Sequence, residues 1–109
     1  MKRIALYPGT FDPFTVGHLS IVERGIQLFD EIIVAIGVNE SKKSVDSVQQ
    51  RVEHIKKVTS NMPGVRVISY TNLTVETAKE YGANFILRGV RTVADYEYER
   101  NLAYANRNL

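Results

Sequence analysis

Short apolar runs alternate along this chain with longer segments of helical spacing, and this alternation limits the folds open to it. The apolar residues gather in four runs, which are Ile4–Tyr7, Ile32–Ile36, the group Val65, Val67 and Ile68, and Phe85–Leu87. Continuous apolar runs of this length are typical of strands that are covered on both faces, as in a parallel sheet.

The segments that follow these runs predict helices. The apolar stripes are Leu19, Val22, Ile26 and Phe29; Val48, Val52 and Ile55, with Ser47 as N-cap; Thr74–Tyr81, stopped by Gly82; and Ala94, Tyr98, Leu102 and Ala105 in a helix that begins at Val93. The order βαβαβαβα implies right-handed crossovers and an α/β fold with a doubly wound parallel sheet.

Composition narrows the class of protein. A chain of 109 residues that is 44% hydrophobic predicts one domain, residues 1–109. It has no cysteine, which excludes a disulfide scaffold and thiol catalysis. A net charge of +2 argues against nucleic acid as a partner. No apolar run approaches the ~18 residues of a membrane span, and the N-terminus does not resemble a signal peptide, so we expect a soluble, intracellular protein.

A doubly wound sheet binds ligands just beyond the carboxyl ends of its strands. The side of the sheet where all the strands end is its carboxyl edge. Four segments are expected to meet there: Tyr7–His18, Gly37–Val45, Ser69–Thr74 and Arg88–Asp95. Reactive side chains are therefore expected in these segments.

The first segment combines Gly9, Thr10 and Gly17-His18, where a helix is expected to begin. A helix N-terminus favours an anion, Gly17 lacks a Cβ that would hold a phosphate away, and His18 can donate a hydrogen bond to it. The alternative is that glycine and proline only form a turn and that His18 only caps the helix. The loop is longer than the ~2–6 residues usual for such a connection, which gives the two interpretations equal weight.

Positively charged side chains are expected just after two other strands. Lys42 lies in the second segment, and Arg88 and Arg91 lie in the fourth, where two guanidinium groups can hold phosphates. The alternatives are a solvated lysine pair and an arginine paired with Asp95 or Glu99. With two histidines and no clustered carboxylates, we expect no protein metal cage. One histidine, hydroxyls, cations and a helix N-terminus suit phosphoryl or nucleotidyl transfer.

These motifs resemble a known family. The segment Tyr7–Pro13 with Thr15-Val16-Gly17-His18 resembles the (H/T)-x-G-H signature of the nucleotidyltransferase superfamily. Together with Ser41-Lys42-Lys43, Leu87–Arg91, Asp95–Glu99 and Asn106-Arg107, it resembles bacterial phosphopantetheine adenylyltransferase, collinearly over all 109 residues.

The resemblance implies a Rossmann-like nucleotidyltransferase fold and reversible transfer of adenylyl from ATP to 4′-phosphopantetheine, giving dephospho-coenzyme A and pyrophosphate. It implies Mg²⁺ bound with ATP, dephospho-coenzyme A or coenzyme A as product or feedback ligand, and a cytoplasmic homohexamer. By position, His18 is catalytic, and Thr10, Lys42, Thr74 and Arg88 bind phosphopantetheine. The ATP-binding residues it implies are Thr10, Phe11, His18, Gly89, Val90, Arg91 and Glu99.

The chain also departs from the family pattern. Asp46 stands where an aromatic residue is common, and Gln49 and Gln50 replace an acidic pair. The family continues beyond a segment like Asn106–Leu109 into a fifth strand and a serine-rich helix start that holds the ATP β- and γ-phosphates. We therefore expect a C-terminally truncated domain of four strands, whose fourth strand is left as an apolar edge.

Two other functions fit the same residues. One is a sister nucleotidyltransferase with another phosphate acceptor, although such families usually have His where this chain has Thr15. The other is a non-catalytic module that binds phosphopantetheine or nucleotide without releasing pyrophosphate.

Overall fold

The computed structural model describes residues 2–38 and 47–88. Its elements are β1 (Ile4–Gly9), α1 (Val16–Gly25), β2 (Glu31–Gly37), α2 (Val48–Val58), β3 (Val65–Tyr70), α3 (Thr74–Glu80) and β4 (Phe85–Ile86). The strands form one sheet in the order β3-β2-β1-β4, and every pairing is parallel. The α/β prediction is therefore confirmed, while the helix expected from Val93 lies outside the described residues.

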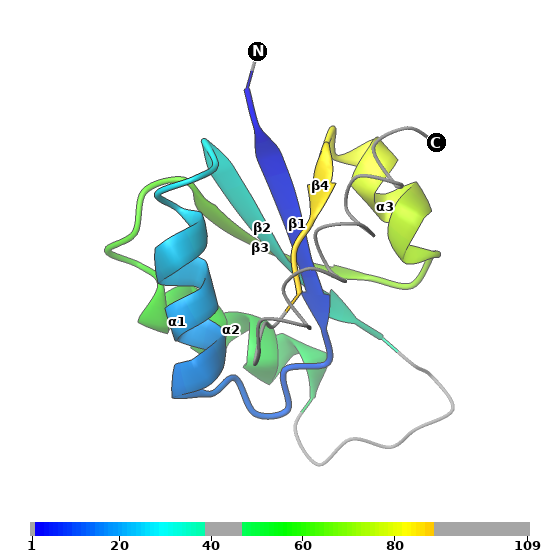
Figure 1. The fold of residues 1–109 in the computed structure, drawn as a ribbon. Coiled ribbons are helices and arrows are strands. Elements are labelled where there is room, and N and C mark those ends of the chain that lie inside the picture. The colour runs from blue at the N-terminus through cyan, green and yellow to red at the C-terminus, as the bar shows by residue number, and fades with distance from the viewer. Residues whose placement is uncertain (1, 39–46, 89–109) are drawn as a thin grey trace.

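The helices cover both faces of the sheet (Figure 1). On one face, α1 and α2 enclose a core that contains Tyr7, Val34 and Ile55. On the other face, Ala78 of α3 packs with Leu6 and Ile33. Successive residues of β1 and β2 point to opposite faces, so both strands are buried on both sides, as their uninterrupted apolar runs predict.

The sheet register places the strand ends together. β1 pairs with β2 from Ile4–Glu31 to Gly9–Ile36, and β2 pairs with β3 up to Gly37–Tyr70. β4 joins β1 on the other side through Phe85 and Ile86. Parallel pairing brings all four carboxyl ends to the lower part of Figure 1, which is the edge where the sequence predicts a site.

The first helix is shorter than its apolar stripe predicts. α1 ends at Gly25, and Ile26 and Phe29 follow in a turn. Gly25 is a poor helix former, and it lies so close to β2 that a Cβ there would be 2.5 Å from Cδ1 of Ile32. The stripe persists beyond the helix because Ile26 and Phe29 still pack against the core from the turn.

The other helix boundaries follow the sequence closely. Ser47 is the N-cap of α2, as predicted. α3 ends at Glu80, and Gly82, with a φ of +72°, turns the chain away from the helix two residues later.

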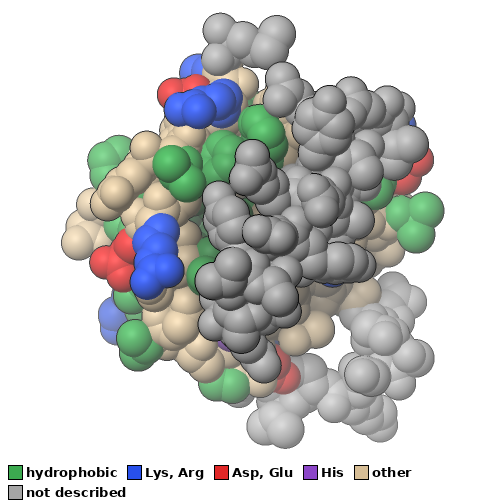
Figure 2. Space-filling view, in the orientation of Figure 1, with side chains coloured by type: hydrophobic (Ala, Val, Ile, Leu, Met, Phe, Trp, Pro, Cys, Tyr) green, Lys and Arg blue, Asp and Glu red, His purple; other side chains and the backbone are tan. Residues whose placement is uncertain are grey.

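None of the described helices is long and apolar enough to cross a membrane. On the face shown in Figure 2, the Lys and Arg side chains of the described residues lie apart from one another, some beside acidic side chains.

Candidate active site

The connection from β1 to α1 is the centre of the candidate site. β1 continues to Gly9 and α1 begins at Val16, so only residues 10–15 connect them. Six residues are within the usual range for a strand-to-helix connection. The expectation of an unusually long loop is wrong, because Tyr7–Gly9 belong to the strand and Val16–His18 belong to the helix. The case for function therefore depends on the geometry of the side chains.

His18 takes part in the cap of α1. The Thr15 backbone N–H donates to Nδ1 of His18 at 2.9 Å, and the His18 backbone N–H donates to Oγ1 of Thr15 at 3.3 Å. This is a reciprocal capping box, with His18 in the place usually held by Glu or Gln. A backbone N–H can only donate, so Nδ1 is the acceptor and the neutral ring carries its proton on Nε2.

This cap confirms one of the two alternatives that the sequence left open, the capping role of His18, while the anion site stays a prediction. His18 caps the helix through Nδ1, and its other ring nitrogen is a separate hydrogen-bond donor. The ring is held at the N-terminus of α1, where the first amide N–H groups have no partner within the helix. A donor and a helix N-terminus in one place form an arrangement that stabilises negative charge on a phosphate.

Aromatic rings surround His18. The Phe11 ring lies edge-on at 5.1 Å between centroids, the Phe14 ring is stacked at 5.4 Å, and the Tyr7 ring lies at 6.4 Å. Burial against these rings lowers the pKa of His18 below its ordinary value, because the charged form loses solvation. Burial also raises the pKa of Tyr7 to about 12. The lowered pKa favours the neutral ring, which Nδ1 requires in order to accept from the Thr15 N–H.

The turn after β1 is built around Phe11. Its φ is +49°, in the left-handed region that side chains rarely adopt, and its ring is buried. A Cβ on Gly9 would be 2.9 Å from Cζ of Phe11, so glycine is required for the ring to fold back against the strand. The ring then contacts His18, and the turn and the helix cap become one packed unit.

Thr10, which is exposed, is held by a residue distant in sequence. Nη1 of Arg51 donates to the carbonyl oxygen of Thr10 at 2.7 Å. Arg51 lies near the start of α2, is only 8% exposed, and its Nε is buried without a hydrogen-bond partner. This bond ties α2 to the turn that precedes His18.

Thr74 lies where the third strand turns into a helix. It is the first residue of α3, and its Oγ1 is 3.0 Å from the hydroxyl of Tyr70, the last residue of β3. The Tyr70 carbonyl in turn accepts from the Val38 N–H at 2.9 Å, just after β2. The second and third strand ends are therefore joined by hydrogen bonds at the edge where Thr74 is predicted to contact a ligand.

The remaining predicted site residues divide into two groups. Arg88 is exposed and follows β4 at the same edge of the sheet. The others, Lys42, Gly89, Val90, Arg91 and Glu99, lie outside the described residues. The structure thus brings Phe11 and His18 into contact and positions Thr10, Thr74 and Arg88 after the carboxyl ends of three strands.

Sequence reasoning missed Arg51 and Tyr70 as parts of this site. Arg51 interrupts the apolar stripe of α2, three residues after Val48 and four before Ile55. A charged residue on a buried helix face is a signal for a specific partner, because such charges are rarely buried unpaired. Tyr70 gave no such signal, since a tyrosine at a strand end is common.

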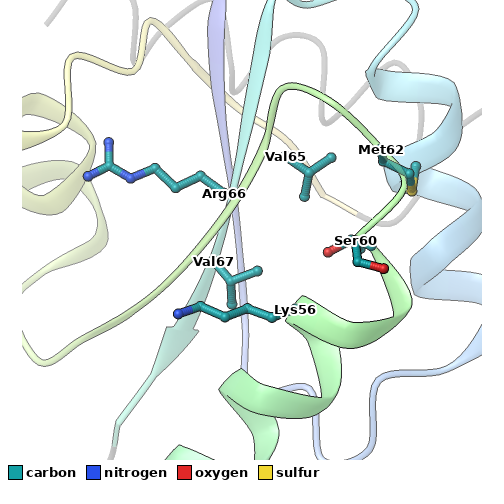
Figure 3. Close-up of a pocket in the computed structure, with 7 residues that line it drawn as sticks. Lys56, Ser60, Met62, Val65, Arg66 and Val67 are labelled. Atoms are coloured by element: carbon teal, nitrogen blue, oxygen red, sulfur yellow. The ribbon is translucent and has the colours of Figure 1, made fainter.

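A surface hollow of about 400 Å³ lies elsewhere, at the amino end of β3 (Figure 3). It is lined by Lys56, Thr59, Ser60, Met62, Val65, Arg66 and Val67. Arg66 points away from Val65 in Figure 3, and its guanidinium lies 5.2 Å from the centre of the Tyr81 ring. Because ligands of this fold bind at the carboxyl ends of the strands, this hollow is not the candidate active site.

Known proteins with similar sequences decide the family. Residues 6–109 match the model of the family described as Cytidylyltransferase-like. The phosphopantetheine adenylyltransferase of Flavobacterium psychrophilum is 51% identical over 107 residues, which are 98% of this chain and 71% of that protein. The chain belongs to the phosphopantetheine adenylyltransferase family. The relative from Porphyromonas gingivalis is 48% identical, over 99% of this chain and 71% of its own length. The relative from Syntrophus aciditrophicus is 50% identical, over 100% of this chain and 66% of its own length.

A solved structure agrees on the fold. The bifunctional NMN adenylyltransferase/ADP ribose pyrophosphatase of Francisella tularensis, complexed with AMP and a manganese ion, aligns with a TM-score of 0.58. It is 21% identical and covers 81% of this chain and 32% of its own length. As a phosphopantetheine adenylyltransferase family member, the chain has the nucleotidyltransferase fold that its motifs predict.

Proposed function

We propose that this protein transfers the adenylyl group of ATP to 4′-phosphopantetheine. A phosphate oxygen of phosphopantetheine forms a bond to the α-phosphorus of ATP, and the bond from that phosphorus to the bridging oxygen breaks. Dephospho-coenzyme A forms and pyrophosphate leaves, with no covalent enzyme intermediate. Family membership supports the choice of substrates, and the observation that carries the mechanism is His18, whose Nδ1 is engaged by the cap while Nε2–H remains a donor.

His18 stabilises the negative charge that grows on the α-phosphate in the transition state. The ring costs little reorganisation at the moment of reaction, because the Thr15 N–H, Phe11 and Phe14 already hold it. The unpaired N–H groups at the start of α1 favour the same charge. Positioning and electrostatics of this kind account for most of the catalysis in phosphoryl transfer.

The other residues bind and align the two substrates. Thr10 lies between them, Phe11 lies beside the nucleotide, Lys42 and Arg88 hold the phosphate of phosphopantetheine, and Thr74 lines its pantetheine arm. The residues on the ATP side are Gly89, Val90, Arg91 and Glu99. Within the described part of the chain, the supporting observation is that Thr10, Thr74 and Arg88 follow the carboxyl ends of β1, β3 and β4, three strands of one parallel sheet.

Magnesium fits this site as a companion of ATP. In residues 2–38 and 47–88, no group of three His, Cys, Asp or Glu side chains is arranged to hold a metal ion. Mg²⁺ is commonly bound by substrate phosphates and water with few protein ligands, so hydroxyl and cationic side chains suffice around it. When bound, the ion neutralises charge on the phosphates of ATP.

We further propose that the protein is a cytoplasmic homo-oligomer, a hexamer as in the family, and that coenzyme A is a feedback ligand.

The decisive experiment measures dephospho-coenzyme A and pyrophosphate formed from ATP, 4′-phosphopantetheine and Mg²⁺, with His18→Gln as control. The same assay with CTP and glycerol phosphate, or with ATP and nicotinamide mononucleotide, separates sister nucleotidyltransferases. Equimolar formation of both products that depends on His18 supports the proposal. Ligand binding without pyrophosphate release contradicts it and favours a binding module.

A further inference from the structure

Arg51 is a buried cation whose charge is not balanced by any residue in the ranges 2–38 and 47–88. The side chain is 8% exposed, and an arginine remains protonated even when it is buried. Its hydrogen bond goes to a neutral group, the carbonyl oxygen of Thr10, and its buried Nε has no partner. Arg66 and Glu31 form an ion pair, whereas the part of the chain that the structure describes shows no such pair for Arg51.

The position of Arg51 in α2 does not explain this burial. It lies near the amino end of the helix, where the helix dipole disfavours a cation, and the first turn has no acidic residue. Burying an unpaired charge is costly, and an apolar residue of similar size often serves stability as well or better. The described part of the fold therefore gives no structural reason for arginine at this position.

Within the described residues, the side-chain hydrogen bond of Arg51 leads to the active site. It ends on Thr10, in the turn that continues through Phe11 to the His18 cap. Thr10 itself is exposed and its bond to Arg51 is only partly buried, so we expect water to reach its carbonyl if the arginine is removed. Loss of the bond thus frees the turn without leaving a buried acceptor unpaired.

We propose that Arg51 is a positioning residue for adenylyl transfer, which holds the backbone of Thr10 and supplies a buried positive charge that the anionic substrates balance. This inference rests on the proposed function for its substrates. It predicts that the protein without ligand gains little stability from Arg51, whereas the substrate complex depends on it.

The test compares three variants. Arg51→Met removes the hydrogen bond and the charge, Arg51→Gln keeps a neutral donor, and Arg51→Lys keeps the charge. Lys57→Gln, on the exposed last turn of the same helix, is the control for a general loss of positive charge. For each variant, kcat and KM are measured for both substrates, together with the thermal midpoint without ligand and with inorganic pyrophosphate.

We expect KM to rise about tenfold or more for at least one substrate in Arg51→Gln and Arg51→Met, as for the loss of a charged hydrogen-bonding group. Arg51→Lys is expected to lie closer to wild type. The thermal shift with pyrophosphate should shrink in parallel, while the midpoint without ligand stays unchanged or rises. If Arg51→Met does not fold, Arg51→Gln and Arg51→Lys carry the comparison.

Three results would overturn the inference. The first is unchanged KM and pyrophosphate shift in Arg51→Gln. The second is a loss of ligand-free stability with normal kinetics of the folded protein, which is what a purely structural arginine gives. The third is equal impairment of Arg51→Lys and Arg51→Gln, which rules out the charge. If wild type forms no dephospho-coenzyme A, the proposed function fails, and the pyrophosphate shifts still test Arg51 separately.

Discussion

The backbone N–H of Thr15 donates to Nδ1 of His18 at 2.9 Å, and this single bond assigns different tasks to the two ring nitrogens. Nδ1 completes the cap of α1, and Nε2–H is a separate hydrogen-bond donor. The second helix of the chain shows that the cap itself does not require histidine. In α2, the Ser47 N–H donates to Oε1 of Gln50 at 3.0 Å, and the Gln50 N–H donates to the Ser47 hydroxyl at 3.1 Å.

The first prediction concerns His18→Gln, which copies the cap of α2 onto α1. The glutamine oxygen can accept from the Thr15 N–H, so we expect a change of less than about 1 kcal/mol in the free energy of unfolding. Turnover should fall by about 10²–10³, the usual cost of losing one preorganised donor to a developing oxyanion. Urea unfolding and steady-state kinetics measure the two effects.

His54→Gln is the matched control, since His54 is exposed on α2. We expect neither its stability nor its turnover to change. Wild-type turnover in His18→Gln would exclude the proposed role, and a large loss of stability would show that the imidazole is needed for the cap.

The second prediction concerns the protonation of His18. Burial against Phe11 and Phe14 lowers its pKa, so its midpoint in an NMR titration should lie below the ordinary value of 6.5. At neutral pH, ¹⁵N shifts should show Nε2 protonated and Nδ1 unprotonated. The resonances are assigned by their absence in His18→Gln, and a midpoint above 6.5 would contradict the prediction.

The same shift has a consequence for stability. A lowered pKa means that the unfolded chain binds the proton more readily than the folded protein. The stability that neutral His18 contributes is therefore complete above pH 6.5 and is lost as the pH falls through the lower folded-state value. Wild type should lose stability relative to His18→Gln over this interval, measured by urea unfolding at several pH values.

Local patterns were enough to predict most of the fold. The runs at Ile4 and Ile32 predicted central strands because burial on both faces leaves no polar alternation in the sequence. Ser47 and Gly82 predicted a helix start and a stop because caps are local chemistry. The end of α1 was not predictable from its stripe, because the turn after Gly25 buries Ile26 and Phe29 on the same side.

The candidate site was predicted in its location more than in its contacts. The strand order of the fold places Thr10, His18, Thr74 and Arg88 at one edge of the sheet. The role of Nδ1 required the geometry of the cap, since histidine replaces the usual Glu or Gln. The bond from Arg51 to Thr10 joins residues 41 positions apart, and no local pattern encodes such a contact.

The third prediction uses two glycines of α1 as a matched pair. A Cβ on Gly17 would be 3.5 Å from Oγ1 of Thr15, an ordinary contact in open space, whereas a Cβ on Gly25 would be 2.5 Å from Cδ1 of Ile32. Of these two glycines, packing therefore requires Gly25 and does not require Gly17. If Gly17 exists for a bound phosphate, Gly17→Ala should keep its stability and lose activity, whereas Gly25→Ala should lose stability and keep activity.

We expect Gly17→Ala to leave stability unchanged or to raise it by up to about 1 kcal/mol, because alanine favours the helix. Its kcat/KM should fall, because the new methyl group lies at the helix N-terminus where an anion would bind. Gly25→Ala should lose about 1–3 kcal/mol from overpacking, with normal kinetics of the folded protein. Full activity of Gly17→Ala would show that no ligand approaches this turn closely.

The last prediction tests the hydrogen bond between the Tyr70 hydroxyl and Oγ1 of Thr74. Tyr70→Phe removes the bond and keeps the ring, so Thr74 loses its anchor at the start of α3. A neutral hydrogen bond contributes about 0.5–1.5 kcal/mol, which corresponds to a rise of about two- to twelvefold in KM for phosphopantetheine. KM for ATP should stay unchanged, because Thr74 is proposed to line only the pantetheine arm. Tyr81→Phe, in which the ring beside Arg66 is retained, is the control, and an equal rise in KM for both substrates would contradict this assignment of Thr74.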